Sequence, residues 1–187
     1  MLQQTKVSTV IPYFNKFYKK FRTIGALSKS RIASVLKLWE GLGYYRRARN
    51  LHQTAKLVLQ KHNGKLPDSF LDLKNLPGIG DYTASAILSI AKDQPFIGID
   101  GNVKRVISRV FNLKHNKKLL LSIEKKLNSM KVKKGSSELM QGIMELGALL
   151  CLPIRPGCTK CPIKSNCISF KKNTFKDRAK KKSYQIK

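Results

Sequence analysis

The feature that most constrains this chain is a glycine-rich turn between two stretches of helical periodicity. Residues 76–80 read Leu-Pro-Gly-Ile-Gly, with a helix predicted from Ser69 to Asn75 before them and another from about Tyr82 to Lys92 after them. Glycine permits backbone conformations that a Cβ atom would forbid. The exposed amides and the helix N-terminus that follows can bind a phosphate without reading a base sequence. A tight turn between two helices with no ligand is the alternative interpretation.

Helical periodicity also dominates the rest of the chain. No run of strict alternation is long enough to predict a sheet, and we expect an all-α fold in two helical lobes. Apolar residues mark one face of a first helix, which Pro12 would kink: Val7, Val10, Ile11, Phe14, Phe17 and Phe21. Further helices are predicted near residues 32–39, 51–59, 102–110, 119–127 and 137–150.

The chain is strongly basic. Its 187 residues include 38 Lys and Arg against 10 Asp and Glu, which gives a formal net charge of +28. Self-repulsion at that charge destabilises the compact state unless a polyanion screens it, and nucleic acid is the expected partner. A generally lysine-rich proteome is the alternative. No segment approaches the roughly 20 apolar residues of a membrane span and no signal peptide opens the chain, so we expect a cytoplasmic protein.

The four cysteines lie in one loop-rich stretch. Cys151, Cys158, Cys161 and Cys167 have the spacing C-x6-C-x2-C-x5-C. Without a secretory signal, disulfides are a poor interpretation. Four thiolates in one loop suit a 4Fe–4S cluster or a tetrahedral zinc ion, although zinc ribbons usually carry two C-x2-C knuckles. The 4Fe–4S cluster is therefore favoured over structural zinc, and over ordinary buried cysteines.

Asp100 is a carboxylate in a chain that has few acidic residues. It stands directly before Gly101 and Asn102, where it can cap the helix predicted over 102–110. It can also face the sugar of a bound nucleotide. Cleavage of an N-glycosidic bond builds positive charge on the sugar, and a nearby carboxylate stabilises that charge. Both roles fit the position.

These motifs together resemble a known family. LPGIGDYTASAI, IDGNVKRV and the cysteine spacing resemble the endonuclease III superfamily of DNA glycosylases. MLQQTKVSTVIPYF and LWEGLGYYRRARNL are similar to the MutY-type adenine glycosylases within it, and the likeness runs from Met1 to about Cys167. The resemblance implies a helix-hairpin-helix glycosylase fold with a 4Fe–4S cluster. It also implies release of adenine mispaired with guanine or 8-oxoguanine, as a step of base excision repair.

The resemblance assigns roles to three residues near the reaction. Asp100 falls on the family's catalytic aspartate, and Asn102 matches a residue that supports it. Tyr82 stands where bifunctional members carry the lysine that forms a Schiff base, so a monofunctional enzyme is implied. Packing against the hairpin is the structural alternative for Tyr82.

The resemblance also implies contacts to double-stranded DNA. Gln4 and Tyr44 or Tyr45 lie in motifs that wedge into the duplex, while Leu2 and Glu145 match positions that line the adenine pocket. Leu2 suits a core position equally well, whereas a core glutamate at 145 would be unusual. The arginines 46, 47 and 49 suit phosphate contacts, or a solvated helix face. The expected DNA-binding residues are Leu2, Gln4, Tyr44, Tyr45, Arg46, Gly78, Gly80, Lys104 and Glu145.

Three regions are expected along the chain, which we expect to act as a monomer. Residues 1–150 would form the helical glycosylase core, with the helix-hairpin-helix at about 69–92. Residues 151–167 would form the iron–sulfur loop. Residues 168–187 carry eight basic side chains from Lys171 onward and would form a tail or linker.

The chain departs from the family at both ends. The family's general-acid glutamate and the helix before it would precede Met1, and this acid is typically worth about 10² to 10⁴ in rate. A late start codon or a truncated form would explain that, and part of the core should be exposed. The domain that recognises 8-oxoguanine would follow the tail. Two alternatives to the adenine glycosylase therefore stay open: a glycosylase for thymine or uracil opposite guanine, and a catalytically impaired DNA-binding fragment.

Overall fold

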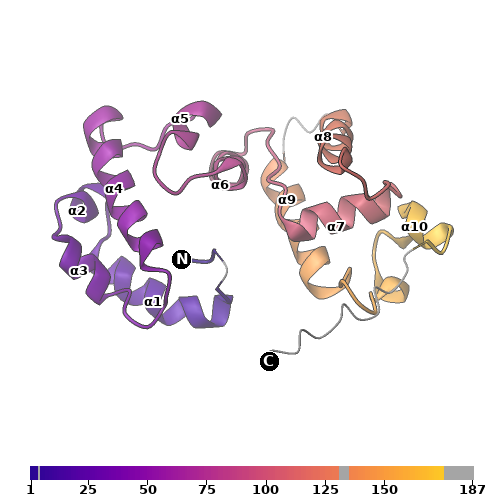
Figure 1. Cartoon of the computed structure of the whole chain (residues 1–187), viewed down its shortest axis with the longest axis horizontal. Coiled ribbons are helices and arrows are strands. Elements are labelled where there is room, and N and C mark those ends of the chain that lie inside the picture. Colours follow the sequence, from indigo (N-terminus) through magenta and orange to yellow (C-terminus); the bar gives the residue numbers. More distant parts are fainter. Residues whose placement is uncertain (4, 131–134, 175–187) are drawn as a thin grey trace, which may run out of the picture. The chain divides into compact units, whose positions relative to one another are not determined.

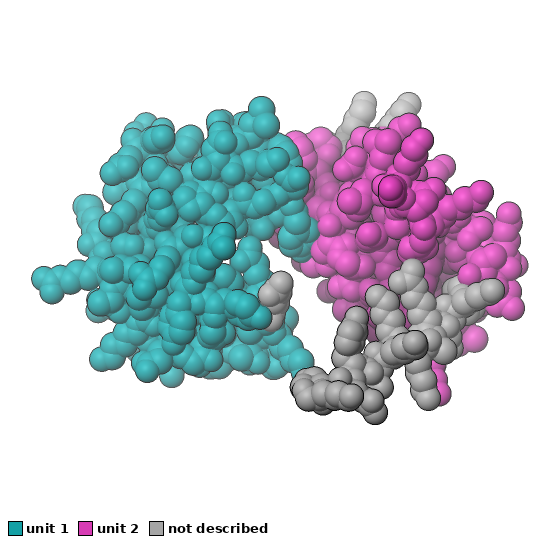
Figure 2. All heavy atoms as spheres, viewed as in Figure 1, with its two compact units in different colours: residues 1–84 teal, residues 85–187 magenta. Residues whose placement is uncertain are grey.

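All regular structure in the described residues is helical. The computed structural model describes residues 1–3, 5–130 and 135–174 (Figure 1). The expected all-α fold is therefore confirmed in this part of the chain. The chain divides into two compact units, Met1–Ala84 and Ser85–Lys187 (Figure 2). No helix in the described part of the chain is both long and apolar enough to cross a membrane.

The first unit packs its helices around an aromatic core. Trp39 is 1% exposed and meets Phe17 edge-on, with the ring centroids 6.0 Å apart. The buried core residues are Val10, Phe17, Phe21, Leu27, Val35, Trp39, Leu42, Ala48 and Ala55. The helices are α1 (Val7–Lys20), α2 (Ile24–Ser28), α3 (Ile32–Lys37), α4 (Tyr45–Lys61), α5 (Phe70–Lys74) and α6 (Asp81–Ala86), which runs across the boundary between the units.

α1 places only part of its apolar surface in this core. Val7, Ile11, Phe14 and Tyr18 are between 52% and 61% exposed, and we call these four residues the α1 stripe. The rings of Phe14 and Tyr18 stack on each other 5.8 Å apart. The predicted apolar face is therefore only partly buried, because its residues span a wider arc of the helix than the core contacts. The helix also continues through Pro12.

The second unit is built on α7 and α9. Val103, Val106 and Ile107 of α7 are buried against residues of α8 and α9, of which Ile123 is fully buried. This packing follows from the apolar period of α7, which sets one face of the helix against its neighbours. The elements are η1 (Ile87–Ala91), α7 (Gly101–Val110), α8 (Leu119–Ser129), α9 (Ser136–Leu149), η2 (Cys158–Lys160), η3 (Lys164–Asn166) and α10 (Ile168–Lys171).

The helix predicted from Tyr82 to Lys92 is divided in the structure. It begins as α6 and continues as η1, a π-helical turn. A π-helical turn is wider than an α-helical one and is common at functional positions. Within η1, the buried Ser89 hydroxyl donates to the carbonyl of Ser136 at 2.9 Å. This bond fastens η1 to the start of α9.

α9 is capped from outside the helix. The carboxylate of Asp93 accepts from the backbone N–H groups of Gly135 and Ser137, each at 3.2 Å. These bonds, that from Ser137 foremost, lower the pKa of Asp93. A carboxylate whose pKa is lowered by folding stabilises the fold above its unfolded-state pKa. That stabilisation is lost as the pH falls through the lowered value.

We expect Asp93→Asn to lower the melting temperature at neutral pH and to flatten the loss of stability below about pH 4. The amide cannot carry the charge that the start of α9 stabilises. Thermal melts between pH 2.5 and 7 would measure both effects. Glu124→Gln removes an exposed carboxylate from α8 in the same unit and should leave the fall of the melting temperature at low pH as in the wild type. If the melting temperatures of Asp93→Asn and of the wild type fell equally steeply at low pH, the cap would be contradicted.

Candidate active site

The candidate site residues are distributed over both units. The first unit holds Leu2, Tyr44, Tyr45, Arg46, Gly78, Gly80 and Tyr82. The second unit holds Asp100, Asn102, Lys104, Glu145 and the four cysteines. Gln4 and residues 175–187 of the basic tail lie outside the described residues.

The turn between α5 and α6 is fixed on the side that faces α4. Leu76 is buried, and its carbonyl accepts from the N–H of Ile79 at 3.1 Å, which closes the turn. The hydroxyl of Thr54 in α4 donates to the carbonyl of Pro77 at 2.9 Å. The turn is therefore held from behind, while Gly78 and Gly80 are exposed.

The two glycines of the turn meet different requirements. Gly78 has a φ of +79°, and a Cβ atom there would lie 2.8 Å from Nδ2 of Asn50 in α4. Conformation and space both exclude a side chain at Gly78. A Cβ on Gly80 would meet nothing within 4 Å. The backbone at Gly80 is therefore open to the approach of a ligand.

The segment before α1 and the start of α4 meet through Arg47. Leu2 is 57% exposed, so the core alternative for this residue is wrong. Tyr44 is 64% exposed, has a φ of +49° and directly precedes α4, while Tyr45 in the first turn of the helix is 43% exposed. The guanidinium of Arg47 donates to backbone carbonyls of both segments, so the phosphate contact predicted for it is wrong. Burial, and to a lesser extent the positive charge of Arg47, lowers the pKa of the α-amino group of Met1.

The other two arginines predicted at this end, Arg46 and Arg49, are open to solvent. Arg46 is exposed on the first turn of α4, where the helix has no acidic residue. Helix N-termini favour anions. The side chain of Arg46 is therefore available to a ligand, whereas that of Arg47 is used within the fold.

Asp100 caps α7. Its Oδ1 accepts from the N–H of Val103 at 2.7 Å, and the residue is half-buried. The capping alternative is therefore confirmed. A carboxylate has two oxygens, so capping through one leaves the other available for a second role.

Asn102 and Arg105 connect the start of α7 to α9 and to the cysteine loop. Nη2 of Arg105 donates to Oδ1 of Asn102 and to the carbonyl of Gly147, both at 2.6 Å. Nε of Arg105 donates to the carbonyl of Cys151 at 2.7 Å. Sequence reasoning gave Arg105 no role. The i, i+3 spacing to Asn102 was a local signal, but the carbonyls of Gly147 and Cys151 are more than 40 residues away.

The contact between Asn102 and Gly147 excludes a larger residue in α9. A Cβ atom on Gly147 would lie 2.7 Å from Cβ and 3.2 Å from Cα of Asn102. Because both atoms belong to or adjoin the α7 backbone, one helix would have to move. Overpacking of this kind typically costs about 1–3 kcal/mol.

We expect Gly147→Ala to lower the free energy of unfolding by about 1–3 kcal/mol, as measured by urea denaturation. Gly142→Ala is the matched control, since it lies in the same helix and a Cβ there meets nothing within 4 Å. Alanine forms helix better than glycine, so the control should be neutral or more stable than wild type. Equal stability of the two variants would show that α7 and α9 do not meet at this contact.

Lys104 and Glu145 lie on the two helices that meet at this contact. Lys104 is half-buried on α7, and Glu145 is exposed on α9, two residues before Gly147. Glu145 is therefore not a core residue, in agreement with the sequence argument. Tyr82 is half-buried on α6 in the other unit.

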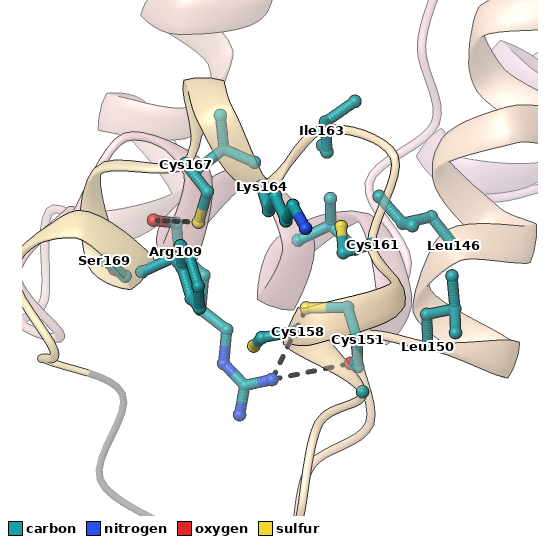
Figure 3. A pocket seen from close by; sticks show the side chains of 14 residues that line it. Arg109, Leu146, Leu150, Cys151, Cys158, Cys161, Ile163, Lys164, Cys167 and Ser169 are labelled. Carbon is teal, nitrogen blue, oxygen red and sulfur yellow. Dashed lines mark hydrogen bonds between the residues drawn. The ribbon is translucent and has the colours of Figure 1, made fainter.

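The four cysteines line one pocket. All four thiols are free and half-buried, and Figure 3 shows them around the pocket between the end of α9 and the loop after it. Burial, followed by the three neighbouring thiols, raises the pKa of Cys158. No group of three His, Cys, Asp or Glu side chains within the described residues is placed to hold a metal ion. The structure thus brings the cysteines to one pocket without setting them around a single point.

Arg109 contacts both ends of the cysteine loop. Its Nη1 donates to the carbonyl of Leu152 at 2.7 Å and lies 3.4 Å from Sγ of Cys151. The thiol of Cys167 donates to the backbone carbonyl of Arg109 at 3.5 Å (Figure 3). Arg109 and Arg105 lie four residues apart on α7, so one helix face anchors the loop.

Comparison with known proteins places this fold and site in a family. Residues 1–131 match the HhH-GPD superfamily of base excision DNA repair proteins, and the chain belongs to that superfamily. It is 44% identical over 188 residues to an adenine DNA glycosylase of Buchnera aphidicola subsp. Baizongia pistaciae, covering 100% of this chain and 54% of the relative. It is 39% identical over 172 residues to the adenine DNA glycosylase of Homo sapiens, covering 89% and 31%.

Solved structures show the same fold. A thermostable thymine-DNA glycosylase matches with a TM-score of 0.77 at 28% identity, covering 91% of this chain and 80% of that one. A trapped covalent intermediate of endonuclease III with DNA matches with a TM-score of 0.76 at 26% identity, covering 93% and 82%. The chain spans about half the length of the bacterial relative, 54%.

Proposed function

We propose that this chain is a monofunctional DNA glycosylase that removes adenine mispaired with guanine or 8-oxoguanine. The observation that carries this proposal is the 44% identity to an adenine DNA glycosylase over the whole chain. Double-stranded DNA is then the substrate, the nucleoid within the cytoplasm is the place of action, and the chain acts as a monomer. The net charge of +28 agrees with such a substrate.

The chemistry that we propose rests on the start of α7. As the glycosidic bond breaks, the carboxylate of Asp100 stabilises the positive charge that develops on the sugar. Asn102, held by Arg105, keeps the first turn of α7 in place beside that carboxylate. A tyrosine at position 82 supplies no amine that could attack the sugar. The product is then free adenine and an abasic site, without strand cleavage.

The DNA contacts that we propose come from the exposed parts of both units. The amides at Gly78 and Gly80 would hold a phosphate, while Leu2, Tyr44 and Tyr45 would contact bases. The glycosidic bond is out of reach in a stacked duplex, so the nucleotide must swing out and a side chain must fill the gap. Exposed aromatic and apolar side chains suit that role. Arg46, Lys104, Gln4 and Glu145 complete the set of residues that we assign to the DNA.

We further propose that the four cysteines hold a 4Fe–4S cluster. Four free thiols line one pocket, and a cluster bonds each thiolate to a different iron, so the sulfurs need not converge on one point. The Arg109 guanidinium 3.4 Å from Sγ of Cys151 would face the negative charge of bound thiolates. The cluster would hold the loop in shape. Zinc and unligated thiols remain as outcomes of the metal analysis.

The test is base release from three duplexes. The chain is incubated with duplexes carrying A·8-oxoguanine, A·G and T·G pairs, and each is then treated with alkali to cleave abasic sites. We expect cleavage at the adenine of the first two duplexes only after alkali. Cleavage of the T·G duplex alone would overturn the proposal in favour of a thymine glycosylase. That alternative is tested because the fold is similar to that of a thymine-DNA glycosylase. Duplex binding without cleavage of any substrate would leave a DNA-binding protein.

A further inference from the structure

Arg47 makes an unusual number of contacts for one side chain near the surface. Its two terminal nitrogens donate to five acceptors at distances between 2.5 and 3.3 Å. Four of the acceptors are backbone carbonyls in two segments that are about 40 residues apart in the chain. The acceptors are the carbonyls of Met1, Gln3, Leu42 and Gly43 and the hydroxyl of Thr5.

Two aromatic rings lie beside the same guanidinium. Its central carbon is 5.6 Å from the ring centroid of Trp39 and 5.3 Å from that of Tyr44. The indole N–H of Trp39 donates to the carbonyl of Gly43 at 3.1 Å, and Arg47 donates to the same carbonyl. A planar guanidinium that stacks and donates in several directions cannot be replaced by a lysine ammonium. The segment before α1, the turn before α4 and the core are therefore joined at one side chain.

The surfaces that Arg47 joins are not core surfaces. The segment before α1 carries Leu2, which is 57% exposed, and the turn ends at Tyr44, which is 64% exposed. The arrangement also has a cost, because Nε of Arg47 is buried and has no partner within the described residues. A buried nitrogen without a partner, in a residue that joins two segments with exposed side chains, favours a role beyond packing.

We propose that Arg47 is a positioning residue that sets Leu2 and Tyr44 as one rigid surface for DNA, and this inference rests on the proposed function. The guanidinium itself contacts no phosphate, because its terminal N–H groups are engaged by the chain. The residue acts through the two segments that it holds. Misplacement of groups around a reacting centre by about 1 Å can cost roughly 10² in rate.

The chain carries its own probe for this proposal. Trp39 is the single tryptophan, is 1% exposed and lies against both Arg47 and Phe17, so its fluorescence is sensitive to loss of the Arg47 contact. Because the surface is set before DNA arrives, we expect a saturating A·8-oxoguanine duplex to leave the emission of the wild type unchanged and to change that of Arg47→Lys, in which the duplex must order the two segments. Emission that responds to DNA equally in the wild type and in Arg47→Lys would overturn the proposal, and this arm needs no catalysis.

The kinetic arm compares Arg47→Gln, Arg47→Lys and a matched control. Lys56→Gln removes one exposed positive charge from the same helix. For Arg47→Gln we expect the single-turnover rate of adenine release to fall by about 10²-fold, while the affinity for an undamaged duplex changes as little as in Lys56→Gln. Arg47→Lys should be impaired to a similar extent, since it keeps the charge and loses the stacked, branched donor.

A purely structural role gives a different pattern. It would lower the melting temperature but leave the folded fraction of either variant with the rate of the wild type, and that result would overturn the proposal. Equal losses in Lys56→Gln and Arg47→Gln would overturn it as well, since charge alone would then suffice. If Arg47→Gln does not fold, the rate and the fluorescence of Arg47→Lys decide. If the emission responds to DNA in Arg47→Lys and not in the wild type, while the wild type binds DNA without releasing adenine, the proposed function is refuted and the positioning role is supported.

Discussion

Asp100→Asn is expected to abolish adenine release without unfolding the chain. Asparagine caps a helix as well as aspartate does, so the bond to the N–H of Val103 and the start of α7 should persist. The amide has no charge with which to stabilise a sugar cation. Loss of one preorganised electrostatic contact of this kind costs about 10² to 10³ in rate, and loss of a charged group beside the reacting atom should cost at least that much.

The measurement separates the two roles of Asp100. Single-turnover release from an A·8-oxoguanine duplex would report the chemistry, and a thermal melt would report the cap. Asp93→Asn removes another carboxylate from the same unit and should keep the rate of the wild type. An Asp100→Asn variant with near wild-type rate would show that Asp100 is a helix cap and nothing more.

Cys158→Ser is expected to have the second large effect, through loss of the proposed cluster. A serine hydroxyl is a poor substitute for a thiolate, and Fe–S clusters are held by cysteine thiolates. Metal-binding free energy becomes folding free energy, on the order of 10 kcal/mol for structural zinc sites. We therefore expect loss of the brown colour, loss of bound iron and sulfide, and a lower melting temperature of the purified protein.

Thr159→Ala is the matched control for the cysteine variant. Thr159 is exposed in the same loop, and its carbonyl, which alanine keeps, accepts a bond from Nζ of Lys164 at 3.1 Å. This variant should keep its colour and iron content. A colourless wild type loaded with zinc would contradict the cluster, and a wild type without any metal would contradict both metal interpretations.

Much of the fold could be predicted because it depends on local signals. The apolar period of α7 and the aspartate before it gave both the helix and its cap. The glycine turn was recognisable because Gly78 meets a conformational requirement that few residues satisfy. By contrast, α2 and α10 went unpredicted, since five and four residues are too few to establish a period.

The arginines could not be predicted, for a physical reason. Arg47, Arg105 and Arg109 each have partners more than 40 residues away in sequence, and only the folded chain brings those partners together. In a chain with a net charge of +28, the simplest interpretation of any arginine is that it contacts an external polyanion. These three instead satisfy backbone carbonyls within their own unit, so a count of basic residues overstates the surface available to DNA.

The α1 stripe has a consequence for handling this chain in solution. Four large apolar side chains on a helix that carries no acidic residue would make copies of the chain adhere if their charges did not keep them apart. Salt screens that repulsion, since the Debye length falls from about 10 Å at 0.1 M to about 3 Å at 1 M. The high salt that strips bound nucleic acid from such a protein should thus also drive its aggregation, which light scattering across a salt series would reveal.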